Sequence, residues 1–167
     1  MGIEIERKYR VIGDNWRSQV VRSVRMAQGY LNDAEALRSG RQRASVRVRI
    51  AGSEAFLNLK SRELGHTRQE FDYAIPVADA DALLALCIGG RIDKLRHYVE
   101  FEGHTFEVDE FFADNAGLIV AELELEHADE AFARPDWLGE EVTDEARYYN
   151  LALAERPYST WTPEEKA

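Results

Sequence analysis

The stretch Glu4-Ile5-Glu6-Arg7-Lys8, close to the start of this 167-residue chain, decides how the rest of the sequence is interpreted. Alternate residues of a β-strand share one face, so a strand over residues 3–12 would place Glu4, Glu6 and Lys8 side by side. Such a charged face is also typical of a half-exposed sheet, in which it simply meets water. The later strands must decide between a functional and a solvent-facing interpretation.

The same sorting of side chains recurs on six later strands. One parity of each strand is almost entirely ionised and the other is apolar, whereas ordinary solvent faces mix Ser, Thr, Gln and Lys. We therefore expect a closed barrel with its charged face inward, because an eight-stranded barrel holds side chains or one small ligand. Buried charges need partners, so this lumen would need a polyanion and cations. The later charged faces are Arg47 and Arg49; Asn58, Lys60 and Arg62; Arg68, Glu70 and Asp72; Lys94 and Arg96; Glu107 and Asp109; and Glu122, Glu124 and Glu126.

Turn residues and apolar periodicity predict the other elements. The predicted fold class is α+β, an antiparallel eight-stranded β-barrel with helices packed outside it. Residues 33–43 read as a loop, and Gly52, Gly65 and Gly103 mark turns. We expect further strands at residues 27–32, 44–50, 55–63, 67–75, 92–102, 104–112 and 118–128, and helices at 15–24, 78–88 and 144–154.

Composition narrows the class of protein. The length suits one domain, which we place at residues 1–158, followed by a frayed tail at 159–167. No apolar run is long enough to span a bilayer and no signal peptide is visible, so we expect a cytoplasmic protein without membrane contact. Cys87 is the only cysteine, which excludes an internal disulfide, and it reads as a buried small hydrophobe. The net charge of −10 disfavours a nucleic-acid partner.

The types of charged residue fit one class of ligand. Arginine provides bidentate forks for phosphate oxygens and lysine provides point charges, while Mg²⁺ prefers carboxylates together with substrate phosphates and waters. No His or Cys cluster favours zinc. The fixed positive charges are Lys8, Arg47, Arg49, Lys60, Lys94 and Arg96, and the hard oxygen ligands are Glu4, Glu6, Glu122 and Glu124.

These residues resemble the motifs of the CYTH superfamily, the triphosphate tunnel metalloenzymes, over about residues 3–154. The hallmark Glu-x-Glu-x-Lys is present as Glu4, Glu6 and Lys8. The organisation is most similar to that of short bacterial single-domain inorganic triphosphatases. The later matching blocks are Gln28-Gly29-Tyr30-Leu31, Arg47-x-Arg49, Leu59-Lys60, Arg68-x-Glu70-x-Asp72, Lys94-x-Arg96, Asp109, Glu122-x-Glu124, Glu141-Val142-Thr143-Asp144 and Tyr148-x-Asn150.

The resemblance implies a tunnel enzyme that hydrolyses a triphosphate with Mg²⁺ or Mn²⁺. It implies metal ligation by Glu4, Glu6, Glu122 and Glu124, with Asp109 at a second ion. Catalytic roles fall on Lys8, Tyr30 and Lys94, with Tyr30 as the partner of Lys8. Arg147 would lie on a C-terminal helix that plugs one tunnel end. The implied phosphate cradle is Lys8, Arg47, Arg49, Lys60, Lys94, Arg96 and Arg147.

Several alternatives stay open at this point. The substrate expected first is inorganic triphosphate, because no nucleotide-recognition insertion is evident. A class IV-type adenylyl cyclase, a thiamine or nucleoside triphosphatase, and a non-enzymatic polyphosphate-binding module share the same residue types. The apolar outer faces fit a homodimer and equally fit a helical cover. Roles for Arg62, Arg68, Glu70 and Asp72 are left undecided.

Overall fold

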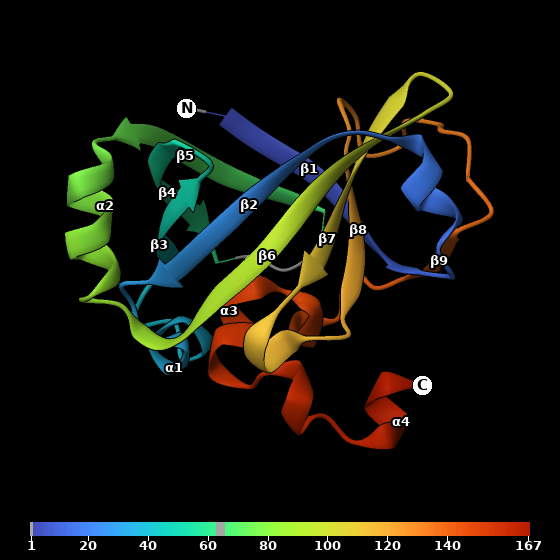
Figure 1. Ribbon diagram of the computed structural model, residues 1–167. Helices are drawn as coiled ribbons and strands as arrows, with labels where there is room; N and C mark the ends of the chain where they lie inside the picture. Colours follow the sequence, from blue (N-terminus) through green and yellow to red (C-terminus); the bar gives the residue numbers. More distant parts are fainter. Residues whose placement is uncertain (1, 63–65) are drawn as a thin grey trace.

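A computed structural model describes residues 2–62 and 66–167 of the chain as a barrel of strands with short helices around it (Figure 1). The helices are η1 (Asn15–Gln19), α1 (Ala34–Arg38), α2 (Val77–Leu84), η2 (Ala113–Asn115), η3 (Ala146–Tyr148), α3 (Asn150–Glu155), η4 (Tyr158–Thr160) and α4 (Pro163–Lys166). The strands are β1 (Gly2–Val11), β2 (Val20–Tyr30), β3 (Ala44–Ala51), β4 (Glu54–Ser61), β5 (Thr67–Ile75), β6 (Ile88–Phe101), β7 (His104–Phe111), β8 (Ile119–Glu124) and β9 (Leu138–Glu141).

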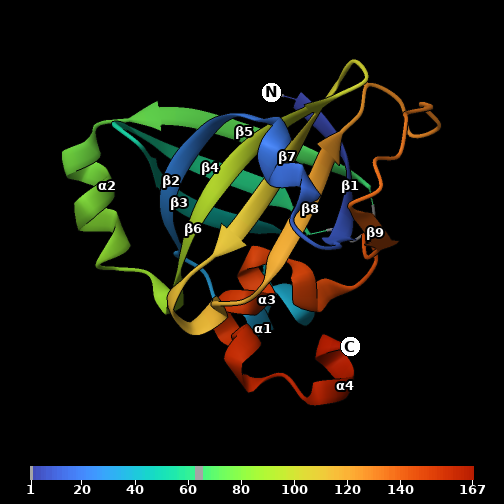
Figure 2. The same cartoon turned by 45° about the vertical axis from the view of Figure 1, so that its right-hand side comes forward.

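The first eight strands close into an antiparallel barrel, which confirms the predicted fold class. Going round the barrel, the order is β1-β5-β4-β3-β2-β6-β7-β8 and back to β1. Strand β1 closes the ring because Gly2–Ile5 pairs with β5 and Glu6–Arg10 pairs with β8. The short β9 adds to β1 near Tyr9 and Val11. Figure 2 shows the ring of strands from a direction that looks partly into it.

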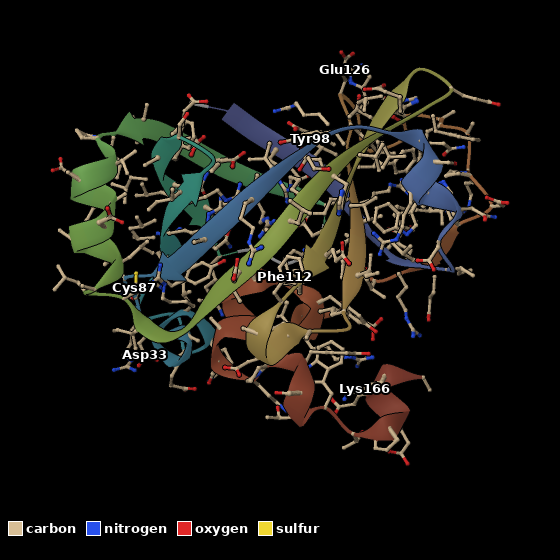
Figure 3. All side chains as sticks on the ribbon, in the orientation of Figure 1. Asp33, Cys87, Tyr98, Phe112, Glu126 and Lys166 are labelled. Carbon is tan, nitrogen blue, oxygen red and sulfur yellow. The ribbon has the colours of Figure 1, made fainter. Side chains whose placement is uncertain are left out.

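The apolar faces of the strands point outward and are covered in three clusters. One cluster centres on Trp16 and Trp137 and is covered by η1 and the chain before β9. A second lies at one barrel end, next to α3 (Figure 1), and includes Leu153 of α3 and Ile92 of β6. The third lies under α2 around Val48 and Leu84, and Cys87 packs against it (Figure 3). Because alternate residues of a strand point to opposite faces, the charged side chains point into the barrel.

The prediction of a helix at residues 15–24 is wrong after Gln19. Only η1 is helical, and β2 begins at Val20 and runs antiparallel to β6 over almost its whole length. The β-branched residues Val20, Val21 and Val24 favour the extended chain, and the ladder to β6 supplies hydrogen bonds that a short helix would lack.

The helix predicted at residues 78–88 also ends earlier than expected. Helix α2 covers Val77–Leu84 and β6 already begins at Ile88, so Gly90 belongs to a strand. A Cβ atom at Gly90 would lie 2.9 Å from the carbonyl oxygen of Ala154. The glycine therefore permits the close approach of α3 to β6 and is not a helix stop.

Two further segments differ from expectation. Residues 33–43 contain α1, which Asp33 caps by accepting a hydrogen bond from the Glu35 amide. Within the predicted tail, Trp161 is 5% exposed and packs into the second cluster. The predicted turn at Gly65 lies outside the described residues. Among the residues that are described, no helix is long and apolar enough to cross a membrane.

Candidate active site

The barrel encloses a cavity of about 1100 Å³. Its wall comes from all eight barrel strands, and α1, η3 and α3 contribute at one end, where Figure 2 shows α1 and α3 together below the strands. Just over half of the residues that line the cavity are charged. Of the predicted site residues, the cavity is lined by Glu4, Glu6, Lys8, Tyr30, Arg47, Arg49, Lys60, Arg96, Glu122 and Glu124.

Four carboxylates from two neighbouring strands form an acidic cluster. The antiparallel register places Glu6 opposite Glu124 and Lys8 opposite Glu122. Burial, reinforced by the nearby charge of Glu122, raises the pKa of Glu6. Burial also raises the pKa of Glu124, together with repulsion from Glu4. Carboxylates that face each other across a strand pair repel, so this cluster requires positive charge nearby.

Three bases supply part of that positive charge. Lys60 Nζ lies 2.9 Å from Glu4 Oε1, and Lys8 Nζ lies 3.0 Å from Glu122 Oε1. Arg68 Nη2 donates to Glu6 Oε1 at 2.5 Å and lies 3.5 Å from Glu4 Oε2. Burial disfavours the charge on Lys8, but Glu122 and Glu6 outweigh it and raise its pKa.

Two arginines on β3 have no such compensation. Arg47 is 8% exposed, and within the described residues neither Arg47 nor Arg49 has a carboxylate oxygen within 4 Å. Arg49 Nε donates to Gln28 Oε1 at 2.8 Å, which orients the guanidinium but does not neutralise it. Burial, with the nearby charges of Arg47 and Arg96, lowers the pKa of Arg49 to about 9. This part of the cavity therefore has uncompensated positive charge.

Lys94, Arg96 and Asp109 form a buried ionic network in the adjacent wall. Asp109 Oδ2 accepts from Lys94 Nζ at 2.7 Å and its Oδ1 accepts from Arg96 Nε at 2.8 Å. Burial lowers the pKa of Lys94 to about 7, despite the opposing charge of Asp109. Asp109 and Lys94 do not line the cavity, although Arg96 and Glu107 do. Asp109 is thus engaged with two bases. Glu107, on the same strand face, reaches the cavity and forms an ion pair with Arg96.

Lys8 has a different aromatic partner from the one expected. Its Nζ lies 4.0 Å from the ring centroid of Tyr149, and the Tyr149 hydroxyl donates to the Thr143 carbonyl oxygen at 2.7 Å. Tyr30 lines the cavity from β2, but no contact with Lys8 is found in the described residues. Tyr149 lies inside the matching block Tyr148-x-Asn150, at the position that the motif leaves unspecified.

Arg147 is not brought to the cavity. Its guanidinium lies over the rings of Tyr148 and Trp161, with centroid distances of 5.0 and 5.3 Å, and forms an ion pair with Glu145. Arg62 is structural in part, because its Nε and Nη2 donate to the carbonyl oxygens of Leu37 and Arg38 at the end of α1. Strand parity does not predict the positions of Arg147 and Arg62.

The acidic cluster fits a hard divalent cation in its chemistry. Glu4 Oε2 is buried and accepts no hydrogen bond in the described part of the chain. Carboxylate oxygens of this kind are the ligands that Mg²⁺ and Mn²⁺ prefer. The cluster is not arranged as a coordination sphere, since no group of three His, Cys, Asp or Glu residues among those described has the geometry to hold a metal ion.

A model of the CYTH domain matches residues 2–158. The chain belongs to the CYTH family. An inorganic triphosphatase from Acetivibrio thermocellus is 41% identical to it over 163 residues, which cover 96% of this chain and 99% of the relative. An inorganic triphosphatase from Nitrosomonas europaea is 36% identical over 154 residues, covering 90% and 96%.

One solved CYTH-like structure agrees with the barrel described above. It is the crystal structure of an inorganic triphosphatase, with a TM-score of 0.63 and 34% identity, and the match covers 92% of this chain and 95% of that one. The CYTH family resemblance of the sequence is therefore confirmed. The individual roles of the site residues stay predictions.

Proposed function

We propose that this CYTH protein hydrolyses inorganic triphosphate to pyrophosphate and phosphate with the help of a divalent cation. The observation that carries the proposal is the pair Arg47 and Arg49, which lack carboxylate partners among the described residues and share one cavity with an acidic cluster. A bound anion would neutralise the two arginines, and a bound cation would neutralise the acidic cluster. Two relatives and a similar solved structure named inorganic triphosphatases support this choice.

The basic wall would bind the phosphate chain. Arg47 and Arg49 project from one strand at alternate positions, so their two planar forks face the same space. Arg96 adds a third guanidinium and Lys60 an ammonium to the cavity wall. Charge from these groups would stabilise the phosphoryl group as it is transferred and the pyrophosphate as it leaves.

The acidic wall would hold the cation, which we take to be Mg²⁺ or Mn²⁺. Glu4, Glu6, Glu122 and Glu124 are the proposed ligands, and Glu107 is added because it reaches the cavity. When bound, the cation would neutralise phosphate oxygens and lower the pKa of water. Asp109 is reassigned to a positioning role, because both of its oxygens hold Lys94 and Arg96.

The reaction itself breaks one P–O bond of triphosphate. A water oxygen forms the new bond to the terminal phosphorus, the bridging oxygen leaves with pyrophosphate, and the water proton is released. Positioning and charge stabilisation dominate such transfers, so the residues of this chain act mainly by holding both partners in line. Lys8 lies within the acidic wall and lines the cavity, so it can contact either the ligand or Glu122.

A substrate panel tests the proposal. The purified protein is incubated with tripolyphosphate, ATP or thiamine triphosphate, each with Mg²⁺ or Mn²⁺, and phosphate, pyrophosphate and cyclic AMP are quantified. We expect equal amounts of phosphate and pyrophosphate from tripolyphosphate, with the highest kcat/KM of the three. Cyclic AMP from ATP would instead show a cyclase, and tight binding of tripolyphosphate without release would show a binding module.

Carboxylate variants test the acidic wall. We expect Glu122→Gln to lower kcat by at least about 100-fold, since removal of a single stabilising group in an active site has effects of that order. Glu126→Gln is the matched control, because Glu126 lies two positions along the chain beyond Glu124 and is exposed outside the cavity (Figure 3). Equal activity of both variants would contradict the assignment.

A further inference from the structure

Arg68 lies between the two carboxylates of the opening motif. Its Nη2 is 2.5 Å from Glu6 Oε1 and 3.5 Å from Glu4 Oε2. All three side chains are largely buried, with 13%, 7% and 9% exposure of Arg68, Glu6 and Glu4. One positive group therefore bridges the two carboxylates that are proposed as metal ligands, and it does so on the Glu4 oxygen that Lys60 does not contact.

The barrel seam fixes this position. Arg68 is the direct cross-strand partner of Glu4, at the β1–β5 pairing that closes the ring. The guanidinium also lies over the ring of Tyr149, 5.1 Å from its centroid. Burial opposes the charge of Arg68, but Glu6 and Glu4 outweigh it and raise its pKa. Arg68 is thus held as a permanent cation at this place.

We infer that Arg68 is a built-in counter-cation that occupies the metal position of Glu4 and Glu6 and must release both carboxylates before a divalent cation binds there. The inference rests on the proposed function, because it takes these carboxylates as metal ligands. The pairing with Arg68 explains how Glu4 and Glu6 stay buried side by side, with their carboxylates directed at bases and not at one common centre.

The consequence is a lower affinity for the metal than the carboxylates alone would give. Whatever free energy holds Arg68 on Glu6 and Glu4 must be given up on metal binding, so the two cations compete. A purely structural role of Arg68 predicts the reverse, since loss of a seam contact would leave metal affinity unchanged or reduced. The two roles therefore differ in the sign of one measurable effect.

The test is calorimetric titration of the metal-free full chain with MgCl₂ or MnCl₂ alone. We expect Arg68→Gln to bind the metal about tenfold or more tightly than the wild type, the scale of one hydrogen bond between charged groups. We also expect a lower Tm for metal-free Arg68→Gln, with a larger rise in Tm on adding metal. Metal affinity equal to or weaker than that of the wild type would overturn the inference.

Two comparison variants separate competition from loss of charge. Arg49→Gln removes a cation from the same cavity but frees no carboxylate. Only the long-range repulsion between Arg49 and the metal is lost, so we expect the metal affinity to change by less than about threefold. Arg25→Gln removes the same charge from the outer surface, where Arg25 pairs with Asp93, and should leave metal affinity unchanged. An equal gain in Arg49→Gln and Arg68→Gln would overturn the competition.

The remaining outcomes are also decisive. If Arg68→Gln does not fold, Arg68→Lys replaces it, because an ammonium keeps the charge but loses the planar fork. We expect Arg68→Lys to bind metal a few-fold more tightly, on the scale of one weakened charge-assisted bond, and an unchanged affinity overturns the inference. Failure of the wild type to bind any divalent cation, with or without tripolyphosphate, would instead overturn the proposed function.

Discussion

At the scale of single residues, the buried charges of this protein fall into two kinds. Asp109 is 1% exposed and both of its oxygens are bonded to bases, so its charge is fully compensated inside the protein. Arg49 has only the amide oxygen of Gln28 as a hydrogen-bond acceptor in the described residues. The first kind stabilises the fold, and the second is reserved for a ligand, because a buried charge without a partner is costly.

Replacing Arg49 should therefore separate function from stability. We expect Arg49→Gln to lower kcat/KM for tripolyphosphate by at least about 100-fold. We expect its free energy of unfolding to be unchanged or higher by about 1 kcal/mol, because a desolvated charge is removed. Phosphate release and urea denaturation check the two parts. Arg49 would be a fold-stabilising residue if the variant lost stability and kept its activity.

Replacing Asp109, in contrast to replacing Arg49, should mainly reduce the stability of the fold. Asp109→Asn leaves Lys94 and Arg96 buried without their common carboxylate, so we expect a loss of about 3–5 kcal/mol in the free energy of unfolding. Asp93→Asn breaks the exposed pair with Arg25, which has similar distances, and should cost about 1 kcal/mol or less. Urea denaturation measures both. Equal losses would show that burial is not what makes the Asp109 network important.

At the scale of elements, the C-terminal segments close one end of the barrel by packing on one another. The ring centroid of Trp161 lies 5.1 Å from that of Tyr148 and 5.0 Å from that of Tyr158, edge-on in both pairs. Asn150, at the start of α3, accepts from Lys94 Nζ at 3.2 Å, so the same segment reaches the buried ionic network. The tail therefore supports the element that lines the cavity.

Removing the Trp161 side chain should loosen this end of the barrel. We expect Trp161→Ala to cost about 3–5 kcal/mol in the free energy of unfolding, as for other buried aromatic residues. Tyr73→Ala is the control, because Tyr73 is 55% exposed and should change stability by about 0.5 kcal/mol at most. Thermal denaturation with circular dichroism measures both variants. A wild-type Tm for Trp161→Ala would mean that the tail contributes nothing to the fold.

At the scale of the whole molecule, the barrel keeps opposite charges on facing walls of one cavity while its apolar faces pack outside. The acidic strands β1 and β8 are neighbours, and the arginines come from β3 on another part of the ring. Because the separation of charge is fixed by strand order, a ligand that bridges the walls should stabilise the entire barrel. The predicted homodimer would use the outer faces and stays a prediction.

Tripolyphosphate alone should therefore raise the Tm of the metal-free protein. At a concentration of about 100 Kd, linkage gives about 2.7 kcal/mol of added stability. The effect should weaken as salt is raised, and it should largely vanish in the double variant Arg47→Gln/Arg49→Gln. Thermal shift measurements in EDTA check this, with sulfate at equal ionic strength as the control. A shift that the double variant retained would place the anion elsewhere.

The alternation of charged and apolar residues along the strands was enough to predict the general fold from the sequence. The two-residue repeat of a strand placed Glu4, Glu6 and Lys8 on one face. The recurrence of ionised faces on six later strands then predicted a closed barrel with these faces inside. The alternation could not predict that Val20–Val24 would be extended, since short apolar segments fit a helix equally well and only the ladder to β6 decides.

The tertiary structure alone decided which charges stay free. Parity places Asp109 and Glu107 on the same face, yet Asp109 lies beyond the cavity wall with two basic partners, whereas Glu107 lines the cavity and pairs with Arg96 alone among the described residues. Tyr149 reaches Lys8 because the C-terminal segment folds back over the barrel end, a contact between positions far apart in the chain. Sequence periodicity gives the face on which a side chain lies, whereas its partners depend on closure of the ring and on what closes its end.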